Sequence, residues 1–182
     1  MPIKNRIAEY QKELMEWRQH FHKYPELAYQ EKQTSKKVIE LLESFGVDKV
    51  EQGIGGTGVV GVIENGKGKS IGLRADMDAL PILEENNSKN YCSKNKGIMH
   101  ACGHDGHTTM LLGAAKYLAE TKNFRGRVIL IFQPAEEGFA GAKAMIDDGL
   151  FKKYPIDEIY GMHNMPNVEK GVLAVQEGPR LA

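Results

Sequence analysis

Hydrophobic residues near the N-terminus recur at helical spacing. From Ile3 to Phe21 the apolar positions alternate in steps of four and three residues, which is the period of one face of a helix. Pro25 follows this stretch and predicts that the helix has ended by that point. A second helix is predicted from about Gln30, with Gly46 as its stop signal.

Short apolar runs in the middle of the chain have the character of strands. The segments GVVGVIE (58–64) and SIGLRA (70–75) are separated by NGKGK, a pattern that predicts a β-hairpin. The longer apolar run GRVILIF (126–132) predicts a buried strand. Two further strands are predicted at DEIYGMH (157–163) and GVLAVQ (171–176).

Helical segments alternate with these strands. TTMLLGAAKYLAE (108–120) predicts a helix, and FAGAKAMIDDG (139–149) predicts another that Gly149 closes. Alternation of strands and helices is typical of α/β proteins. We therefore expect a three-layer sandwich with a mixed, largely parallel sheet.

Composition narrows the class of protein. The 182 residues are enough for one domain with its own core, and 41% hydrophobic and 26% charged residues are ordinary for a globular protein. The formal charge of zero argues against nucleic acid or an anionic membrane as the main partner. No apolar run approaches the length of a membrane span. The two cysteines, Cys92 and Cys102, are too few for a disulfide framework, which favours a reducing, cytoplasmic location.

The segment GIGGTG (53–58) matches the glycine spacing of a dinucleotide-binding loop. That motif works only where a helix begins, because the pyrophosphate binds the amides at a helix N-terminus. The β-branched segment that follows favours a glycine-rich turn between two strands. A nucleotide-binding domain remains an alternative that would require a helix from about Thr57.

Metal-binding residue types are concentrated in IMHACGHDGHTT (98–109). This stretch holds five of them: His100, Cys102, His104, Asp105 and His107. Further candidates lie at the ends of the predicted strands: Asp76 and Asp78 just past the first, Glu136 and Glu137 just past the second, and His163 as the last residue of the third. Ligands of open α/β sheets bind beyond the carboxyl ends of the strands, so we expect these segments to meet at one edge.

Each candidate alone also has a structural explanation. Asp105 could be the N-cap of the helix that follows it. Glu136 and Glu137 could complement the dipole of a helix, and His163 could be a structural histidine. The convergence of four segments on one edge favours a functional site.

The residue types point to metal-dependent hydrolysis. Because neighbouring side chains leave the backbone in different directions, one carboxylate of the pair Glu136–Glu137 can bind metal while the other acts as general base. The Cys102 thiolate, the imidazoles of His104 and His163, and one carboxylate suit a divalent transition metal. The chain has neither the CxxC pairs of structural zinc sites nor an HExxH motif.

Several motifs together resemble one enzyme family. These are HKYPELAYQE, GLRADMDALPI, MHACGHDGHT, FQPAEEG and GMHNMP. They are similar to the metal-dependent amidohydrolases typified by hippurate hydrolase, which are metallopeptidase relatives of aminoacylase with a zinc-exopeptidase-like fold. The resemblance implies two divalent ions, Mn²⁺ or Zn²⁺. It implies that the metal ligands are Cys102, His104, Glu137 and His163, and that the general base is Glu136. It also implies that Asp78 orients the site rather than binding metal.

The resemblance implies an activity as well. Members hydrolyse the amide bond of N-acyl amino acids, such as hippurate-like or N-acetyl substrates, with a metal-bound water and a glutamate base. Members are about twice as long and dimerise through a lid domain, so we expect residues 1–182 to be the N-terminal part of the catalytic domain, without the lid or the closing segment of the sheet. The alternative is a non-catalytic remnant or metal-binding fragment that needs a partner to complete its site.

Overall fold

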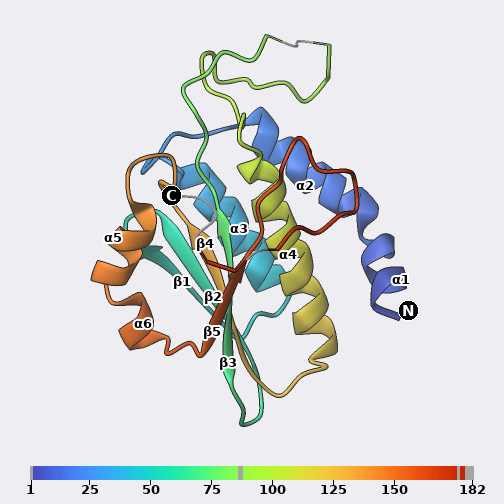
Figure 1. The fold of residues 1–182 in the computed structure, drawn as a ribbon, viewed down its shortest axis with the longest axis vertical. Helices are drawn as coiled ribbons and strands as arrows, with labels where there is room; N and C mark the ends of the chain where they lie inside the picture. The colour runs from blue at the N-terminus through green and yellow to red at the C-terminus, as the bar shows by residue number, and fades with distance from the viewer. Residues whose placement is uncertain (1, 86–87, 176, 179–182) are drawn as a thin grey trace.

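The protein forms one mixed sheet with helices on both of its faces (Figure 1). The computed structural model describes residues 2–85, 88–175 and 177–178. Its helices are α1 (Pro2–Glu9), α2 (Gln11–Lys23), α3 (Lys32–Ser44), α4 (His104–Thr121), α5 (Gly141–Asp147) and α6 (Leu150–Lys153). Its strands are β1 (Lys49–Ile54), β2 (Gly58–Asn65), β3 (Ser70–Asp76), β4 (Gly126–Gln133) and β5 (Glu158–Gly161).

The five strands lie in the order β1-β2-β4-β3-β5. The pairs β1–β2 and β2–β4 are antiparallel, whereas β3 is parallel to both β4 and β5. The predicted α/β class and the mixed sheet are confirmed. The carboxyl ends of β3, β4 and β5 therefore face the same way.

Two apolar clusters hold the three layers together. Strand β4 alternates its side chains between the faces, so that Leu130 and Phe132 join one cluster while Ile129 and Ile131 join the other. The first cluster packs under α2, α3 and α4, and the second packs under α5 and α6 (Figure 1). A strand buried on both faces requires apolar residues at every position, which explains the unbroken run in β4.

The predicted hairpin between residues 58–64 and 70–75 is wrong. Strand β4 lies between the two strands and pairs with both, so that β2 and β3 are not neighbours. The connecting loop passes against the start of β4, where a Cβ on Gly68 would lie 2.8 Å from the carbonyl oxygen of Arg125. Strands joined by a short connection usually pair with each other. Here each of them pairs with β4 instead, because β4 is long and apolar along its length.

Three further expectations need adjustment. The first predicted helix breaks at Tyr10, whose N–H donates to the Ile7 carbonyl in a tightened turn. The predicted helix 139–149 is α5, and Gly149, at φ +90°, separates it from α6. Residues 171–175 form no strand within the described part of the chain, because they pair with no other strand there; Gln176 lies outside the described residues.

The glycine-rich segment 53–58 is a turn between two strands, as predicted. Strands β1 and β2 pair across it in antiparallel register, and the chain continues from Gly58 as a strand. The dinucleotide-binding alternative is thereby excluded, because it required a helix from about Thr57. No helix in the described part of the chain combines the length and apolar character needed to cross a bilayer.

One glycine at the start of α5 tests how tightly the carboxyl edge of the sheet is packed. A Cβ on Gly141 would lie 1.7 Å from the Pro134 carbonyl oxygen, whereas a Cβ on Gly106 in α4 would meet no heavy atom within 4 Å. We expect Gly141→Ala to lower the free energy of unfolding by about 2–4 kcal/mol through overpacking. Gly106→Ala is the matched control and should raise it by up to about 1 kcal/mol. Urea denaturation of the metal-free chain, followed by circular dichroism, measures both; similar stabilities for the two variants would contradict this packing.

Candidate metal centre

The candidate residues gather at the carboxyl ends of the three parallel strands. Strand β3 ends at Asp76, and β4 is followed at once by the segment that contains Glu136 and Glu137. His163 lies two residues beyond the end of β5. Parallel pairing places these strand ends side by side, so the expected meeting at one edge of the sheet is observed.

Helix α4 begins earlier than predicted, at His104 rather than near residue 108. Gly103 precedes it in the left-handed region, at φ +89°. A Cβ there would lie 2.3 Å from the side-chain oxygen of Asn164, so only glycine fits at this position. Asp105 is therefore in the first turn and not the N-cap, the position that Gly103 occupies.

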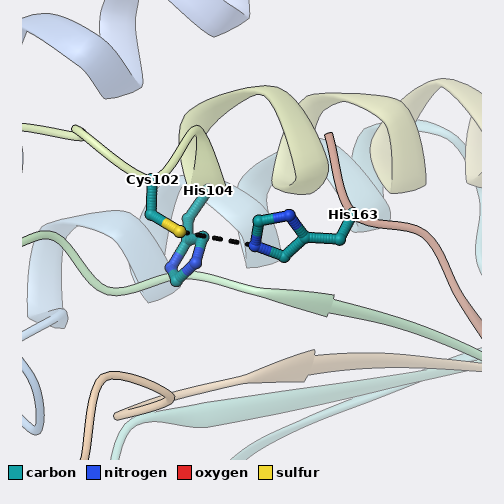
Figure 2. A group of neighbouring side chains, drawn as sticks. All are labelled: Cys102, His104 and His163. Carbon is teal, nitrogen blue, oxygen red and sulfur yellow. Dashed lines mark hydrogen bonds between the residues drawn. The ribbon is translucent and has the colours of Figure 1, made fainter. Parts of the chain in front are cut away.

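Cys102, His104 and His163 form the centre of the site. Their ligand atoms lie within 4.8 Å of one another, and the Cys102 Sγ is 3.3 Å from the His163 Nε2. Figure 2 shows the sulfur atom beside the His104 ring and facing the His163 ring, with His104 at the start of α4 and His163 reaching in from the segment after β5. A thiol and two imidazoles from three separate segments thus converge on one point.

The two glutamates approach the same imidazole. The His104 Nε2 lies 3.8 Å from a carboxylate oxygen of Glu136 and 3.8 Å from one of Glu137. Glu137 is the more buried of the pair, with 23% of its side chain exposed against 37% for Glu136. All five residues of the expected site are therefore brought together, and the burial of the two carboxylates differs.

Hydrogen bonds present both imidazoles in the form that binds metal. The His104 Nδ1 lies 2.9 Å from the Asp78 carbonyl oxygen, and the His163 Nδ1 lies 2.7 Å from the Asn164 carbonyl oxygen. A carbonyl only accepts, so each Nδ1 carries the proton and donates it. The lone pair of each Nε2 is then free to bind a cation.

Six buried side-chain atoms within the described residues have no hydrogen-bond partner, and two of the six belong to the expected metal ligands. These two are the His104 Nε2 and the Glu137 Oε1. A buried acceptor without a partner is costly unless another group satisfies it. A divalent cation between these atoms would satisfy both, so the residues present fit a metal ion.

The electrostatics of the thiol also fit a cation. Burial, together with the negative charges of Glu137 and Glu136, raises the pKa of Cys102 to about 12. The thiol alone is therefore protonated at neutral pH. A bound divalent cation reverses this balance, because a coordinating thiol is deprotonated.

Asp78 contacts two of the candidate ligands. Its Oδ2 accepts the backbone N–H of Glu137 at 3.0 Å, and its Oδ1 lies 3.3 Å from the His104 Nδ1. Burial, the largest influence, works against ionisation, yet the contact with His104 and the backbone hydrogen bonds keep the pKa of Asp78 below its usual value. Asp78 thus connects two candidate ligands.

A second buried group shares His104 with the site and adds Asp76 and His107, which are absent from the expected ligand set. Asp76, His104 and His107 also bring ligand-type atoms within 4.8 Å of one another. The His107 Nδ1 donates to Asp76 at 2.6 Å, and its Nε2 accepts the backbone N–H of Asn164 at 3.1 Å. Although burial opposes it, the hydrogen bond from His107 and the charges of His104 and Arg74 lower the pKa of Asp76 to about 2.

His107 therefore holds the backbone of Asn164, the residue that follows His163. The sequence signal for this role was the position of Asp76 directly after a strand, together with a histidine one helical turn beyond a candidate ligand. Periodicity alone could not show that Asn164 would complete the group.

The other side of the α4 N-terminus is held by a buried ion-pair network. Asp105 accepts from the His22 Nδ1 at 2.8 Å and from the Arg18 Nε at 2.9 Å. The His22 Nε2 lies 3.1 Å from a carboxylate oxygen of Glu84. Since both ring nitrogens face carboxylates, His22 is held as imidazolium: the hydrogen bond to Asp105 raises its pKa even though burial opposes the shift.

Comparison with known proteins places the chain in a family. The sequence profile of peptidase family M20/M25/M40 matches residues 72–178, which is more than half of the chain and contains every candidate ligand.

Individual relatives agree with this match. The chain is 55% identical over 161 residues to the hippurate hydrolase of Campylobacter jejuni, covering 88% of this chain and 41% of the relative. It is 47% identical over 185 residues to thermostable carboxypeptidase 1 of Saccharolobus solfataricus, covering 99% and 46%. The chain thus spans less than half the length of these two relatives.

A solved structure shows the same fold. The Bacillus subtilis YXEP protein, described as a dinuclear metal binding peptidase from the M20 family, superposes with a TM-score of 0.88 at 39% identity. The match covers 94% of this chain and 48% of that one.

The high pKa of the Cys102 thiol predicts that metal binding releases its proton. We expect Zn²⁺ binding at pH 7 to release about one proton fewer in Cys102→Ser than in the unaltered chain, because a coordinating thiol must ionise. Affinity should fall by at least about 100-fold, since losing a group that merely supports a ligand already costs about 10- to 100-fold. Calorimetry in buffers of different ionisation enthalpy counts the protons. Equal proton release by the two proteins would rule out thiolate coordination.

The His22 network predicts a pH-dependent stability. Because the folded-state pKa of His22 lies above its unfolded value near 6.5, its contribution is complete below pH 6.5 and disappears as the pH rises through the folded-state pKa. We expect His22→Gln to destabilise the metal-free chain by about 1–3 kcal/mol at pH 6 and by less at pH 9, measured by urea denaturation at each pH.

His20→Gln is the matched control on the same helix. Partial burial and the neighbouring Lys37 lower the pKa of His20, so its replacement should not produce a destabilisation that shrinks with rising pH. A His22→Gln effect that is constant from pH 6 to 9 would contradict the charged state assigned to His22.

Proposed function

The chain belongs to peptidase family M20/M25/M40, and on that premise we propose that it is the metal-binding part of a hydrolase that cleaves the amide bond of N-acyl amino acids. The observation that carries the proposal is the set of two unsatisfied buried ligand atoms, the His104 Nε2 and the Glu137 Oε1, beside a thiol and a second imidazole. This donor set is typical of a divalent transition metal.

Four residues are proposed as metal ligands. They are Cys102, His104, Glu137 and His163. The ligand-type atoms of Cys102, Glu137 and His163 all lie near the His104 ring. Thiolate and imidazole favour Zn²⁺, while carboxylate and imidazole also accept Mn²⁺. Two ions are proposed, in keeping with the description of the Bacillus subtilis structure as dinuclear. A reducing, cytoplasmic location is part of the proposal, because it would keep Cys102 as a thiol.

Glu136 is proposed as the general base. A divalent cation bound at this site would polarise the amide carbonyl and acidify water. The Glu136 carboxylate, the more exposed of the pair, is close to the His104 Nε2 yet open to an incoming substrate. In this role Glu136 takes a proton from the attacking water and returns it to the nitrogen of the leaving amine.

The substrate class rests on the relatives. Hippurate is an acyl group joined by an amide to an amino acid, and a carboxypeptidase likewise cleaves an amide whose amine side carries a free carboxylate. The names of both relatives therefore support an amide with a carboxylate on the leaving amine. N-benzoyl and N-acetyl amino acids are the first substrates to test.

Identical substitutions at the two adjacent glutamates separate the proposed roles. We expect Glu136→Gln to retain metal affinity within about threefold and to lose about 10²- to 10⁴-fold in turnover, the usual contribution of a general base. Glu137→Gln should weaken metal binding by at least about tenfold, since it replaces a charged ligand by a neutral one. Metal titration and hippurate hydrolysis, each with Mn²⁺ and with Zn²⁺, measure both properties.

Two results would overturn these assignments. Near-normal turnover by Glu136→Gln with metal bound would remove Glu136 from the role of base. If the unaltered 182-residue chain binds metal but hydrolyses neither hippurate nor N-acetyl amino acids, the alternative of a metal-binding, non-catalytic fragment would be favoured instead.

A further inference from the structure

The turn that carries Glu136 and Glu137 has an unfavourable backbone conformation. In this turn, residues 134–140, Ala135 and Ala140 have φ angles of +51° and +55°. Residues with a Cβ rarely adopt this left-handed region, because the Cβ crowds the backbone. Such a conformation persists only where surrounding contacts enforce it, so the contacts of this turn decide where its two carboxylates lie.

Three side chains hold the turn at alternate residues. Glu31 accepts the backbone N–H of Ala135 at 2.8 Å. Asp78 accepts the N–H of Glu137 at 3.0 Å. The hydroxyl of Tyr29 donates to the carbonyl of Phe139 at 2.9 Å. Two of these three contacts come from residues 29 and 31, so one short segment before α3 grips the turn on both sides of the glutamate pair.

Glu31 is an unusual anchor because it is a completely buried carboxyl group. None of its surface is exposed, and its second oxygen accepts a hydrogen bond from the Thr57 hydroxyl. Burial raises the pKa of Glu31 despite these hydrogen bonds. A buried carboxyl is costly unless its hydrogen bonds are made, which indicates that both contacts are structurally required.

The same contacts explain why the segment 53–58, which is not a dinucleotide-binding loop, is rich in glycine. Thr57 presents its hydroxyl to Glu31. A Cβ on Gly56 would lie 3.3 Å from the Tyr29 ring, and one on Gly58 would lie 3.1 Å from the ring of Pro134. The glycines thus allow the β1–β2 turn to pack closely against both the anchoring segment and the glutamate turn.

We propose that Glu31 and Tyr29 are positioning residues that clamp the 134–140 turn and thereby set where the carboxylates of Glu136 and Glu137 lie. The clamp links three segments: the one before α3, the β1–β2 turn and the glutamate turn. Its link to metal binding rests on the proposed function, whereas its effect on the turn does not.

The clamp predicts the outcome of three substitutions. Tyr29→Phe removes one hydrogen bond at a partly exposed residue, and Glu31→Ala removes two in the interior. Glu31→Gln keeps the shape, can still accept the Ala135 N–H and can donate to the Thr57 oxygen, so it should rescue the clamp. Tyr24→Phe makes the matching change on a tyrosine of similar exposure, 43% against 39% for Tyr29.

Hydrogen exchange on the metal-free chain tests the clamp directly. In the peptide covering residues 133–141, Tyr29→Phe and Glu31→Ala should exchange about tenfold faster than the unaltered chain, because lost anchors raise the population of the open turn. Glu31→Gln and Tyr24→Phe should exchange within about threefold of it. Peptides from β2 report whether the whole protein has loosened. If Glu31→Ala fails to fold, Tyr29→Phe decides; unchanged exchange in Tyr29→Phe overturns the proposal.

Titration with Co²⁺ tests the link from the clamp to the site. Tyr29→Phe should weaken Co²⁺ binding by about fivefold or more while the absorption band of the Cys102 thiolate is kept, and Glu31→Gln should bind as the unaltered chain does. Faster exchange without weaker binding would reduce the clamp to a structural contact and overturn its positioning role. If the unaltered chain binds no Co²⁺ at all, the proposed metal site fails, while the exchange result still decides whether the clamp exists.

Discussion

The parallel pairing of β3 with both β4 and β5 is the constraint on which the site depends. Three strands that run the same way must end at the same edge, so whatever follows Asp76, Gln133 and Gly161 is delivered there. The pairing itself depends on β4, which enters between β2 and β3 and is apolar on both faces. A polar residue in the middle of β4 would therefore disturb the core and the site together.

Charge concentrates at this edge to an extent that folding alone does not explain. Four carboxylates, those of Asp76, Asp78, Glu136 and Glu137, lie around the His104 ring, and Arg74 compensates Asp76 at 2.7 Å. Grouping like charges in a partly buried space costs stability unless opposite charge enters. The site thus gives up stability in the metal-free chain, and a divalent cation would offset that cost through the very atoms that lack partners.

The parts of this arrangement that were predictable from sequence are those that local rules control. The ends of β3 and β4 and their polar continuations could be placed from the apolar runs, and the β1–β2 turn could be separated from a nucleotide loop because the following residues are β-branched. The insertion of β4 between β2 and β3 could not be predicted, because strand neighbours are chosen by long-range burial. The contacts of His107 with Asn164 and of Glu31 with Ala135 could not be predicted for the same reason, since each joins segments far apart in the chain.

The supports of the site are therefore less visible in the sequence than its ligands, although the geometry depends on them equally. His104 can present its Nε2 only because the Asp78 carbonyl takes the proton of its Nδ1. Asp78 in turn holds the backbone of Glu137, and Glu31 holds the residue two positions before it. A ligand set copied onto another α/β sheet without these acceptors would leave the rings and carboxylates free to rotate. Affinity for a cation then falls even though every ligand is present, because the cost of ordering the ligands moves from folding to binding.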